Sequence, residues 1–543
     1  MDNQPHGVTH LIFDDEAREK LLAGIRIAAK AVGCTMGPKG KNVIIQRDGG
    51  TPIVTKDGVT VSKAIKLKDP CERMGADLVK EAAARTNEVA GDGTTTATVL
   101  TWGLVEEGMK LLKGGYSAVE LKIGIERGVE LLIAHLKEMS RPVMNSEDVI
   151  RVGTISANGD RKIGEILSEA MDKVGKSGII TIEEATGMTT NLHVVEGMQI
   201  DRGYLSPMFA TNSEKMNASY DDGLVLITDK KISNLQELVP VLEAVQRAQK
   251  SLLIIADEVE GSALHGLIVN KIGGALKVVA IKAPGFGNMR DALLQDLATL
   301  TGAQLISDRV GKGLEKVTLA DLGKVKKFTV DAKSTMIVGN GSTAEAIKKH
   351  VADLSSQMED LTLSEDEKKV LKLRIAKLAA GVAVIKVGGA TEVEMKERKD
   401  RIEDALNATQ AAVDEGILPG GGMALLFAQR DSSLRANIDS EKNLAIKAGM
   451  QIVEKVCEYP IRKIVSNTGK NPDVILERMS REESVTGSKS LGYNAAKEEI
   501  CDMIAEGIID PLKVTRTALE NACSVANTFL LLDAVVINNE EDE

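Results

Sequence analysis

The segment Gly91-Asp92-Gly93-Thr94-Thr95-Thr96 leads directly into a short apolar run of helical character, Ala97–Leu100. Its two glycines allow positive φ angles and a close approach of the backbone to a ligand. Free N–H groups at a helix N-terminus attract phosphate, three hydroxyl groups add donors, and Asp92 offers a hard oxygen for Mg²⁺. The segment fits a phosphate site, and it also fits a Thr-rich helix cap. It is not a Walker A loop, because the Gly-x4-Gly-Lys-Ser/Thr spacing is absent.

Three further turns carry glycine or proline next to residues that can contact a ligand. Thr35-Met36-Gly37-Pro38-Lys39-Gly40 follows the first expected helix, and Pro419-Gly420-Gly421-Gly422 precedes an apolar run. Thr55-Lys56-Asp57-Gly58 places a cation and a carboxylate in one turn. Each of these segments, taken singly, also fits an ordinary solvated turn.

The periodicity of apolar residues predicts helical ends around an α/β centre. Strand-like and helical segments alternate in the centre, which is typical of an α/β domain. A hairpin of 43–45 with 53–55 is expected near the start, its turn at 47–50. Helices are expected over 17–32, 71–90, 94–113, 119–139, 240–250, 261–272, 288–301, 364–377 and 394–415, and strands over 178–183, 192–196, 224–228, 252–256, 277–281 and 382–387.

The Gly-rich turns all fall in the two helical ends and none falls in the centre. If the two ends share one site, the central α/β segment is an insertion between two halves of a base domain. A length of 543 residues agrees with roughly three or four domains.

Composition makes several classes of partner poor candidates. The formal net charge of −11 disfavours nucleic acids and anionic membranes, and 2% aromatic residues disfavour a base-stacking platform. No apolar run approaches the ~18 residues that a membrane span needs. The first residues show no basic leader followed by an apolar stretch, and the five cysteines are scattered, so we expect a cytoplasmic protein.

Eight motifs occur in the order found in group I chaperonins, the GroEL family of 60 kDa chaperonins, which the chain resembles from about Phe13 to Val536. The resemblance implies an equatorial domain (1–138 and 415–543), an intermediate hinge domain (139–195 and 382–414) and an apical α/β domain (196–381). The motifs are Thr-Met-Gly-Pro-Lys-Gly (35–40), Thr-Lys-Asp-Gly-Val (55–59), Ala-Gly-Asp-Gly-Thr-Thr-Thr-Ala-Thr-Val-Leu (90–100), Gly-Thr-Ile-Ser-Ala-Asn (153–158), Asp-Arg-Gly-Tyr-Leu-Ser-Pro (201–207), Lys-Ala-Pro-Gly-Phe-Gly (282–287), Gly-Gly-Gly (420–422) and Tyr-Asn-Ala-Ala (493–496).

The resemblance also implies an ATPase that uses Mg²⁺, with K⁺ as a further candidate cation. Asp92 would bind the Mg²⁺, and Asp404 and Asp57 would be the catalytic carboxylates, with Asp404 positioning the attacking water. Taken alone, Asp404 would be interpreted as a solvated residue of a charged helix. The implied nucleotide-binding residues are Thr35, Met36, Gly37, Pro38, Lys56, Asp92, Gly93, Thr94, Thr95, Thr96, Gly421, Asn494, Ala495, Ala496 and Asp510.

For the apical segment the resemblance implies an exposed apolar groove that captures unfolded client proteins and a GroES-like co-chaperonin lid. Apolar stripes at helical spacing are more often core, so the residues themselves leave both interpretations open. Met208 stands where the family often has an aromatic residue. The implied groove residues are Tyr204, Phe209, Val239, Leu242, Leu264, Ile268 and Val269.

The implied assembly is a homo-oligomeric ring of seven subunits, as two stacked rings. Asn471 departs from the acidic residue that relatives often use between rings, which leaves single and double rings open. The chain also lacks the Gly-Met tail common in the family, and it has extra residues near 439–447 and 480–489. The alternative function is a holdase or scaffold that binds proteins without using ATP.

Overall fold

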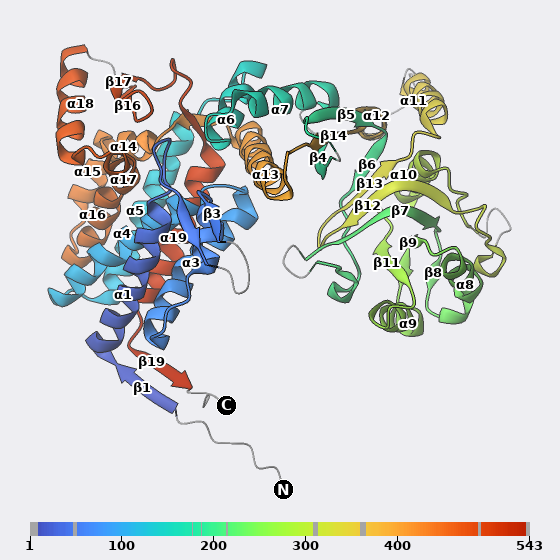
Figure 1. The fold of residues 1–543 in the computed structure, drawn as a ribbon, viewed down its shortest axis with the longest axis horizontal. Helices are drawn as coiled ribbons and strands as arrows, with labels where there is room; N and C mark the ends of the chain where they lie inside the picture. Colours follow the sequence, from blue (N-terminus) through green and yellow to red (C-terminus); the bar gives the residue numbers. More distant parts are fainter. Residues whose placement is uncertain are drawn as a thin grey trace, which may run out of the picture. The chain divides into compact units, whose positions relative to one another are not determined.

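The computed structural model describes residues 9–46, 52–175, 178–185, 187–212, 216–307, 313–358, 365–486 and 490–538. It divides into two compact units, the first made of Met1–Ser168 with Asp400–Glu543 and the second of Glu169–Lys399. Both ends of the chain therefore form one unit and the middle forms the other (Figure 1). The three domains implied above are a finer division, and their bounds stay a prediction. The hairpin turn 47–50 lies outside the described residues.

Long helices packed side by side form the first unit (Figure 1). The long helices are α1 (Asp14–Gly33), α3 (Pro70–Ala90), α4 (Thr94–Lys113), α5 (Ala118–Met139), α16 (Leu444–Val456) and α19 (Leu512–Leu530). Helices α1 and α3 come into backbone contact. A Cβ atom at Gly24 of α1 would lie only 1.8 Å from the carbonyl oxygen of Glu72 of α3, and a Cβ atom at Gly75 of α3 would lie 2.0 Å from the carbonyl oxygen of Leu21 of α1.

Shorter helices and two-stranded sheets complete the first unit. The predicted hairpin is confirmed, since Val43–Ile45 (β2) pairs antiparallel with Ile53–Thr55 (β3). The sequence did not predict the other pairings, of β1 (Thr9–Phe13) with β19 (Ala534–Asn538), β15 (Ile417–Pro419) with β18 (Ile509–Pro511), and β16 (Leu491–Asn494) with β17 (Glu499–Asp502). The shorter helices are α2 (Gly58–Ala64), α6 (Ser146–Ser156), α14 (Met423–Gln429), α15 (Ser432–Ser440), α17 (Tyr459–Asn467) and α18 (Pro472–Thr486). Two further helices, α7 (Arg161–Val174) and α13 (Glu392–Glu415), run from one unit into the other.

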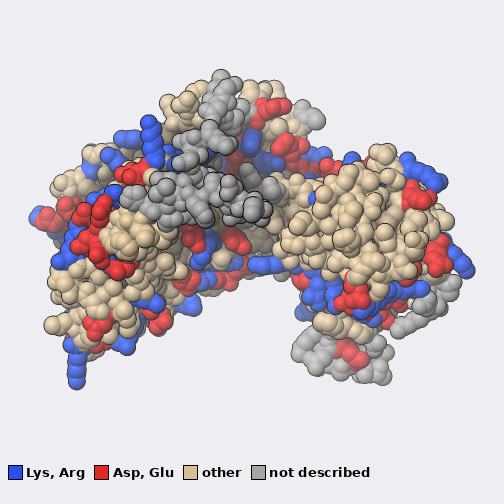
Figure 2. Space-filling view, turned by 90° about the horizontal axis from the view of Figure 1, so that it is seen from below, with Lys and Arg blue, Asp and Glu red and all other residues tan. Residues whose placement is uncertain are grey.

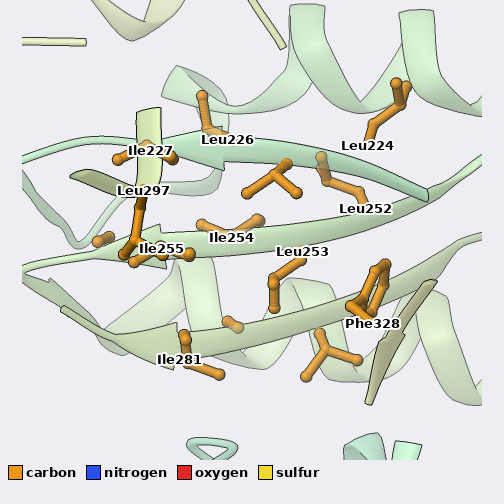
Figure 3. Packing of buried hydrophobic residues seen from close by; sticks show 14 of the residues in the cluster. Leu224, Leu226, Ile227, Leu252, Leu253, Ile254, Ile255, Ile281, Leu297 and Phe328 are labelled. Atoms are coloured by element: carbon orange, nitrogen blue, oxygen red, sulfur yellow. The ribbon is translucent and has the colours of Figure 1, made fainter. Parts of the chain in front are cut away.

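The second unit contains a six-stranded sheet with the order β11-β9-β7-β12-β13-β6. Its parallel part is β7 (Ala218–Ile227), β9 (Ser251–Ala256) and β11 (Lys277–Lys282), and all six residues of β9 are buried, as expected for a central parallel strand. Figure 3 shows the apolar side chains of this part packed with Leu297 and Phe328. The antiparallel strands are β12 (Gly323–Val330), β13 (Thr335–Gly339) and β6 (Gly197–Ile200).

Further helices and smaller sheets accompany the six-stranded sheet in the described part of the second unit. The small sheet has the order β4-β14-β5, formed by Ile179–Glu184, Val382–Val387 and Asn191–Val195. The predicted strands 178–183, 192–196 and 382–387 are thereby confirmed. The helices are α8 (Val239–Arg247), α9 (Gly261–Ile272), α10 (Gly287–Thr301), α11 (Ala344–Met358) and α12 (Glu365–Ala380).

Charged side chains of both signs are interspersed on the face of the molecule seen in Figure 2. Among the helices of the described residues, none combines the length and the apolar character that a membrane span requires.

Candidate functional site

The Gly91–Thr96 turn joins α3 to α4 with an N-terminus that no side chain caps. Gly91 and Gly93 have φ angles of +68° and +87°. A Cβ atom at Gly91 would lie 2.2 Å from Cβ of Asn407, and one at Gly93 would lie 2.7 Å from Cγ1 of Val514, so both positions require glycine. Because the threonines do not cap α4, its first N–H groups remain open to an anion, which favours the phosphate site over the helix cap.

The turn that carries Asp57 lies directly against this N-terminus. A Cβ atom at Gly58 would lie 2.3 Å from Oγ1 of Thr95 and 3.5 Å from Oγ1 of Thr94. The Asp57 carboxylate caps α2, accepting hydrogen bonds from the N–H groups of Val59 (3.1 Å) and Thr60 (2.8 Å). Lys56, beside it, is exposed.

Four carboxyl groups of the first unit act on one another through their charges: Asp57, Asp92, Asp404 and Asp510. Burial, followed by the negative charges of Asp92 and Asp57, raises the pKa of Asp404 to about 8. Burial and Asp92 raise the pKa of Asp510 to about 7, although the N–H groups of Gly421 and Gly422 donate to it. Burial also raises the pKa of Asp92. A cation would relieve the repulsion among these groups.

The donor set fits Mg²⁺ bound together with phosphate. Within the described residues, no three His, Cys, Asp or Glu side chains come together as a metal site of their own. Mg²⁺ on a nucleotide needs only one or two carboxylates, because phosphate oxygens and water supply its other ligands. Asp92, one residue before the open N-terminus of α4, has the right chemistry and the right place for this role.

The implied nucleoside-binding residues also lie in the first unit, and buried contacts join several of them. Met36 and Ala495 belong to one buried apolar cluster with Val99 of α4 and Met423 of α14. The Asn494 carboxamide oxygen accepts hydrogen bonds from the N–H groups at 496 (3.1 Å) and 497 (3.2 Å), which shapes the turn after β16. The segments 35–40, 420–423 and 494–498, distant in sequence, thus each contribute a residue to one apolar core.

A salt bridge and a side-chain amide hold the first of these segments in place. Glu498, which has a φ of +60°, accepts from Nζ of Lys39 at 2.6 Å and from Nζ of Lys470 at 3.3 Å. The Asn467 amide donates to the carbonyl oxygens of Gly33 (3.0 Å) and Met36 (2.9 Å).

Sequence reasoning missed three residues that the structure places at the site. Asn467 supports the 35–40 turn, Asn407 packs against Gly91, and the Ser156 hydroxyl donates to the Asp92 carboxylate at 2.9 Å. Ser156 stands within the 153–158 motif, for which the resemblance implied no role. The predicted nucleotide-binding, metal-binding and catalytic residues all belong to the first unit: Thr35, Met36, Gly37, Pro38, Lys56, Asp57, Asp92, Gly93, Thr94, Thr95, Thr96, Asp404, Gly421, Asn494, Ala495, Ala496 and Asp510.

The expected apolar groove of the second unit is only partly exposed. Phe209 (0% exposed) and Leu242 (7%) belong to the core of the second unit, so the expectation that they are exposed is wrong. Helical spacing identifies an apolar face but does not decide whether solvent or a sheet covers it. Val269 is 52% exposed, and the remaining residues, Tyr204, Val239, Leu264 and Ile268, are partly buried.

Two apolar residues outside the list of implied groove residues are exposed: Met208, which stands where the family often has an aromatic residue, and Ile272. Met208 is 59% exposed and Ile272 is 64% exposed. The Lys271 ammonium group donates to the carbonyl oxygens of Met208 (2.8 Å) and Ala210 (2.7 Å), which ties the 207–209 turn to α9. The most exposed apolar side chains on α9 and the 207–209 turn are therefore Met208, Val269 and Ile272, of which only Val269 belongs to the predicted set.

Replacing Asp404 by asparagine is expected to change how stability depends on pH. The folded state binds the Asp404 proton more tightly than the unfolded chain does, so this group costs stability as the pH rises from about 4 to about 8. Without nucleotide, the variant should melt at a higher temperature than the parent, by about 4 °C or more at pH 8 and by less at pH 5. Thermal unfolding from pH 5 to 9 measures this difference, and parallel curves for the two proteins would contradict it.

Two comparisons place the chain among known proteins. A model of the TCP-1/cpn60 chaperonin family matches residues 28–540. Among solved structures, the chaperonin gp146 from the bacteriophage EL 2 (Pseudomonas aeruginosa), crystallised in the presence of ATP-BeFx, matches with a TM-score of 0.69 and 23% identity over 98% of this chain and 99% of that chain. A second crystal form of gp146 matches with a TM-score of 0.63 at 23% identity over the same shares of the two chains. At this identity the likeness to gp146 shows a common fold.

Proposed function

Because this chain belongs to the TCP-1/cpn60 chaperonin family, we propose that it is an ATP-dependent molecular chaperone whose first unit binds and hydrolyses Mg-ATP. The observation that carries the proposal is the uncapped N-terminus of α4, with the Asp92 carboxylate one residue before it. An open helix N-terminus binds phosphate, and a neighbouring carboxylate supplies a ligand for the metal ion on that phosphate.

Each part of the site has a role in this proposal. The N–H groups and hydroxyls of 94–96 bind phosphate oxygens, with Gly93 allowing the close approach and Lys56 reaching the phosphates from solvent. Residues 35–38, Gly421, 494–496 and Asp510 hold the nucleoside. K⁺ is a second candidate cation near the phosphates.

Asp404 and Asp57 prepare the water that attacks the terminal phosphate. Phosphoryl transfer needs a well-oriented nucleophile and charge stabilisation more than it needs a strong base. With its pKa near 8, Asp404 holds a proton in the nucleotide-free protein at neutral pH, and it must lose that proton to accept one from water. Bound Mg²⁺ supplies the positive charge that neutralises the phosphate oxygens. Asp57 keeps its carboxylate in place by capping α2.

The second unit captures non-native clients through an exposed apolar surface, since burial of apolar area is non-directional and suits many sequences. Val269 is the most exposed of the predicted groove residues, and Met208 and Ile272 extend its apolar surface. We further propose that the chain assembles into seven-membered rings, two of which stack, and that a GroES-like lid closes the ring. The proposed location is the cytoplasm. Gly197 and Gly381 are proposed hinge positions.

An ATPase assay separates this function from that of a holdase. We expect Mg²⁺-dependent phosphate release by the purified chain, and loss of that release when EDTA removes the metal. Capture of a denatured protein should weaken when ATP and Mg²⁺ are added together. Capture without any phosphate release, and indifferent to ATP, would favour an ATP-independent holdase.

A further inference from the structure

The hydroxyl group of Ser156, the last residue of α6, donates to Oδ2 of Asp92 at 2.9 Å. The other carboxylate oxygen, Oδ1, accepts a hydrogen bond from the N–H group of Gly93 at 2.6 Å. One hydrogen bond on each oxygen fixes both the direction and the plane of the carboxylate. Each oxygen keeps lone pairs that can take a further ligand.

Helix α6 does not use this hydroxyl group for its own structure. At the C-terminus of the helix the N–H group of Ala157 donates to the carbonyl oxygen of Gly153 at 2.9 Å. Thr154, two residues before Ser156, behaves differently, because its hydroxyl group donates to the carbonyl oxygen of Ile150 in the same helix at 2.6 Å. The Ser156 contact therefore serves the turn that carries Asp92.

The same helix packs against the elements that carry two other carboxyl groups of the site. Val152 of α6 is buried in a small cluster with Ala408 of α13 and Ile509 of β18. Ala408 follows Asp404 by one helical turn, and Ile509 directly precedes Asp510. A single helix thus contacts three of the segments that form the site.

Hydrogen bonds fix the N-terminus of α6. Asn145 caps the helix by accepting from the N–H group of Asp148 at 2.9 Å. The buried Asp148 carboxylate in turn accepts hydrogen bonds from Arg141, at 3.1 and 3.3 Å, and from the N–H group of Met144 at 3.2 Å. A helix fixed at its start and packed along its length presents Ser156 at a defined position.

We propose that Ser156 is a positioning residue that holds the Asp92 carboxylate in the orientation needed to bind Mg²⁺ on the nucleotide. This inference rests on the proposed function, since it assigns a supporting partner to the proposed metal ligand. Groups that hydrogen-bond a metal ligand orient it, and their removal weakens metal binding by about tenfold or more. Loss of the hydroxyl group should therefore weaken the Mg²⁺-dependent part of nucleotide binding and leave the metal-independent part unchanged.

The test compares Ser156→Ala, Ser156→Thr and the control Thr154→Val on the same helix. Titration calorimetry measures the affinity of each full-length protein for AMP-PNP, a non-hydrolysable ATP analogue, once with Mg²⁺ and once with EDTA. We expect Ser156→Ala to bind Mg-AMP-PNP about tenfold more weakly than the parent does. Binding in EDTA should be the same for both. Ser156→Thr, which keeps a hydroxyl group, should restore most of the loss, and Thr154→Val should match the parent.

Three outcomes would overturn the inference: equal Mg²⁺-dependent affinity for Ser156→Ala and the parent, equal weakening of Ser156→Ala with and without Mg²⁺, or failure of Ser156→Thr to recover any of the loss. The second would indicate a general structural defect. A parent protein whose AMP-PNP binding does not respond to Mg²⁺ at all would instead refute the proposed function, and this inference with it.

Discussion

Replacing Asp404 by alanine is expected to leave ATP binding intact and to slow hydrolysis at least about tenfold, because the group that orients the attacking water is lost. Binding should persist, since the phosphate contacts come from the N-terminus of α4 and the metal contact from Asp92. Phosphate release under saturating Mg-ATP measures the rate, and titration with AMP-PNP measures the affinity.

A control variant on the same helix separates this effect from a change in α13 as a whole. Asp414→Ala removes a carboxylate whose ion pair with Lys513 (2.9 Å) lies ten residues further along α13. Its ATPase rate should equal that of the parent. Unchanged phosphate release by Asp404→Ala would remove Asp404 from the mechanism, and a slow Asp414→Ala would show that the helix itself is sensitive.

The second large effect is expected from a matched pair of substitutions in the second unit. Leu242→Glu places a carboxylate in the core of the second unit, where Leu242 is 7% exposed, and should destabilise the unit by at least about 3 kcal/mol. Val269→Glu, at a side chain that is 52% exposed, should change stability by about 0.5 kcal/mol or less. The glutamate on the exposed apolar surface should instead reduce the capture of denatured clients.

Urea unfolding, followed by intrinsic fluorescence or circular dichroism, measures the stability of both variants, and co-sedimentation with a denatured protein measures capture. Capture at the parental level by a folded Val269→Glu protein would exclude this surface as the client site. A Leu242→Glu protein as stable as its parent would contradict the burial of that side chain.

Local patterns predicted many of the helices and strands but not several strand pairings. Pro240 suits a first helical turn, and α8 accordingly begins at Val239. Strand β12 was not predicted because three lysines interrupt its apolar pattern. Two of them, Lys326 and Lys327, are adjacent and both half-buried, so the strand does not show a regular alternation of buried and exposed residues. The pairing of β1 with β19 joins the two ends of the chain, and no short-range pattern contains that information.

For the site, too, local patterns were predictable and contacts between distant residues were not. The Gly91–Thr96 segment indicated a phosphate site through its own residue types, yet only the structure excludes the alternative that its threonines cap α4. The catalytic role of Asp404 was implied only by the resemblance to a family. From sequence alone, a carboxylate in a charged helix is interpreted as a solvated residue. Ser156 reaches Asp92 across 64 residues of sequence, so nothing near either residue could reveal the contact.

The most direct test of the account is a cryo-electron microscopy structure of the Asp404→Ala protein with ATP and Mg²⁺. We expect a triphosphate at the N-terminus of α4, in contact with 94–96, and a Mg²⁺ ion bound by Asp92. We also expect the nucleoside to lie between residues 35–38 and 494–496. A nucleotide bound elsewhere in the chain, or a site left empty at saturating ATP, would contradict the proposed site.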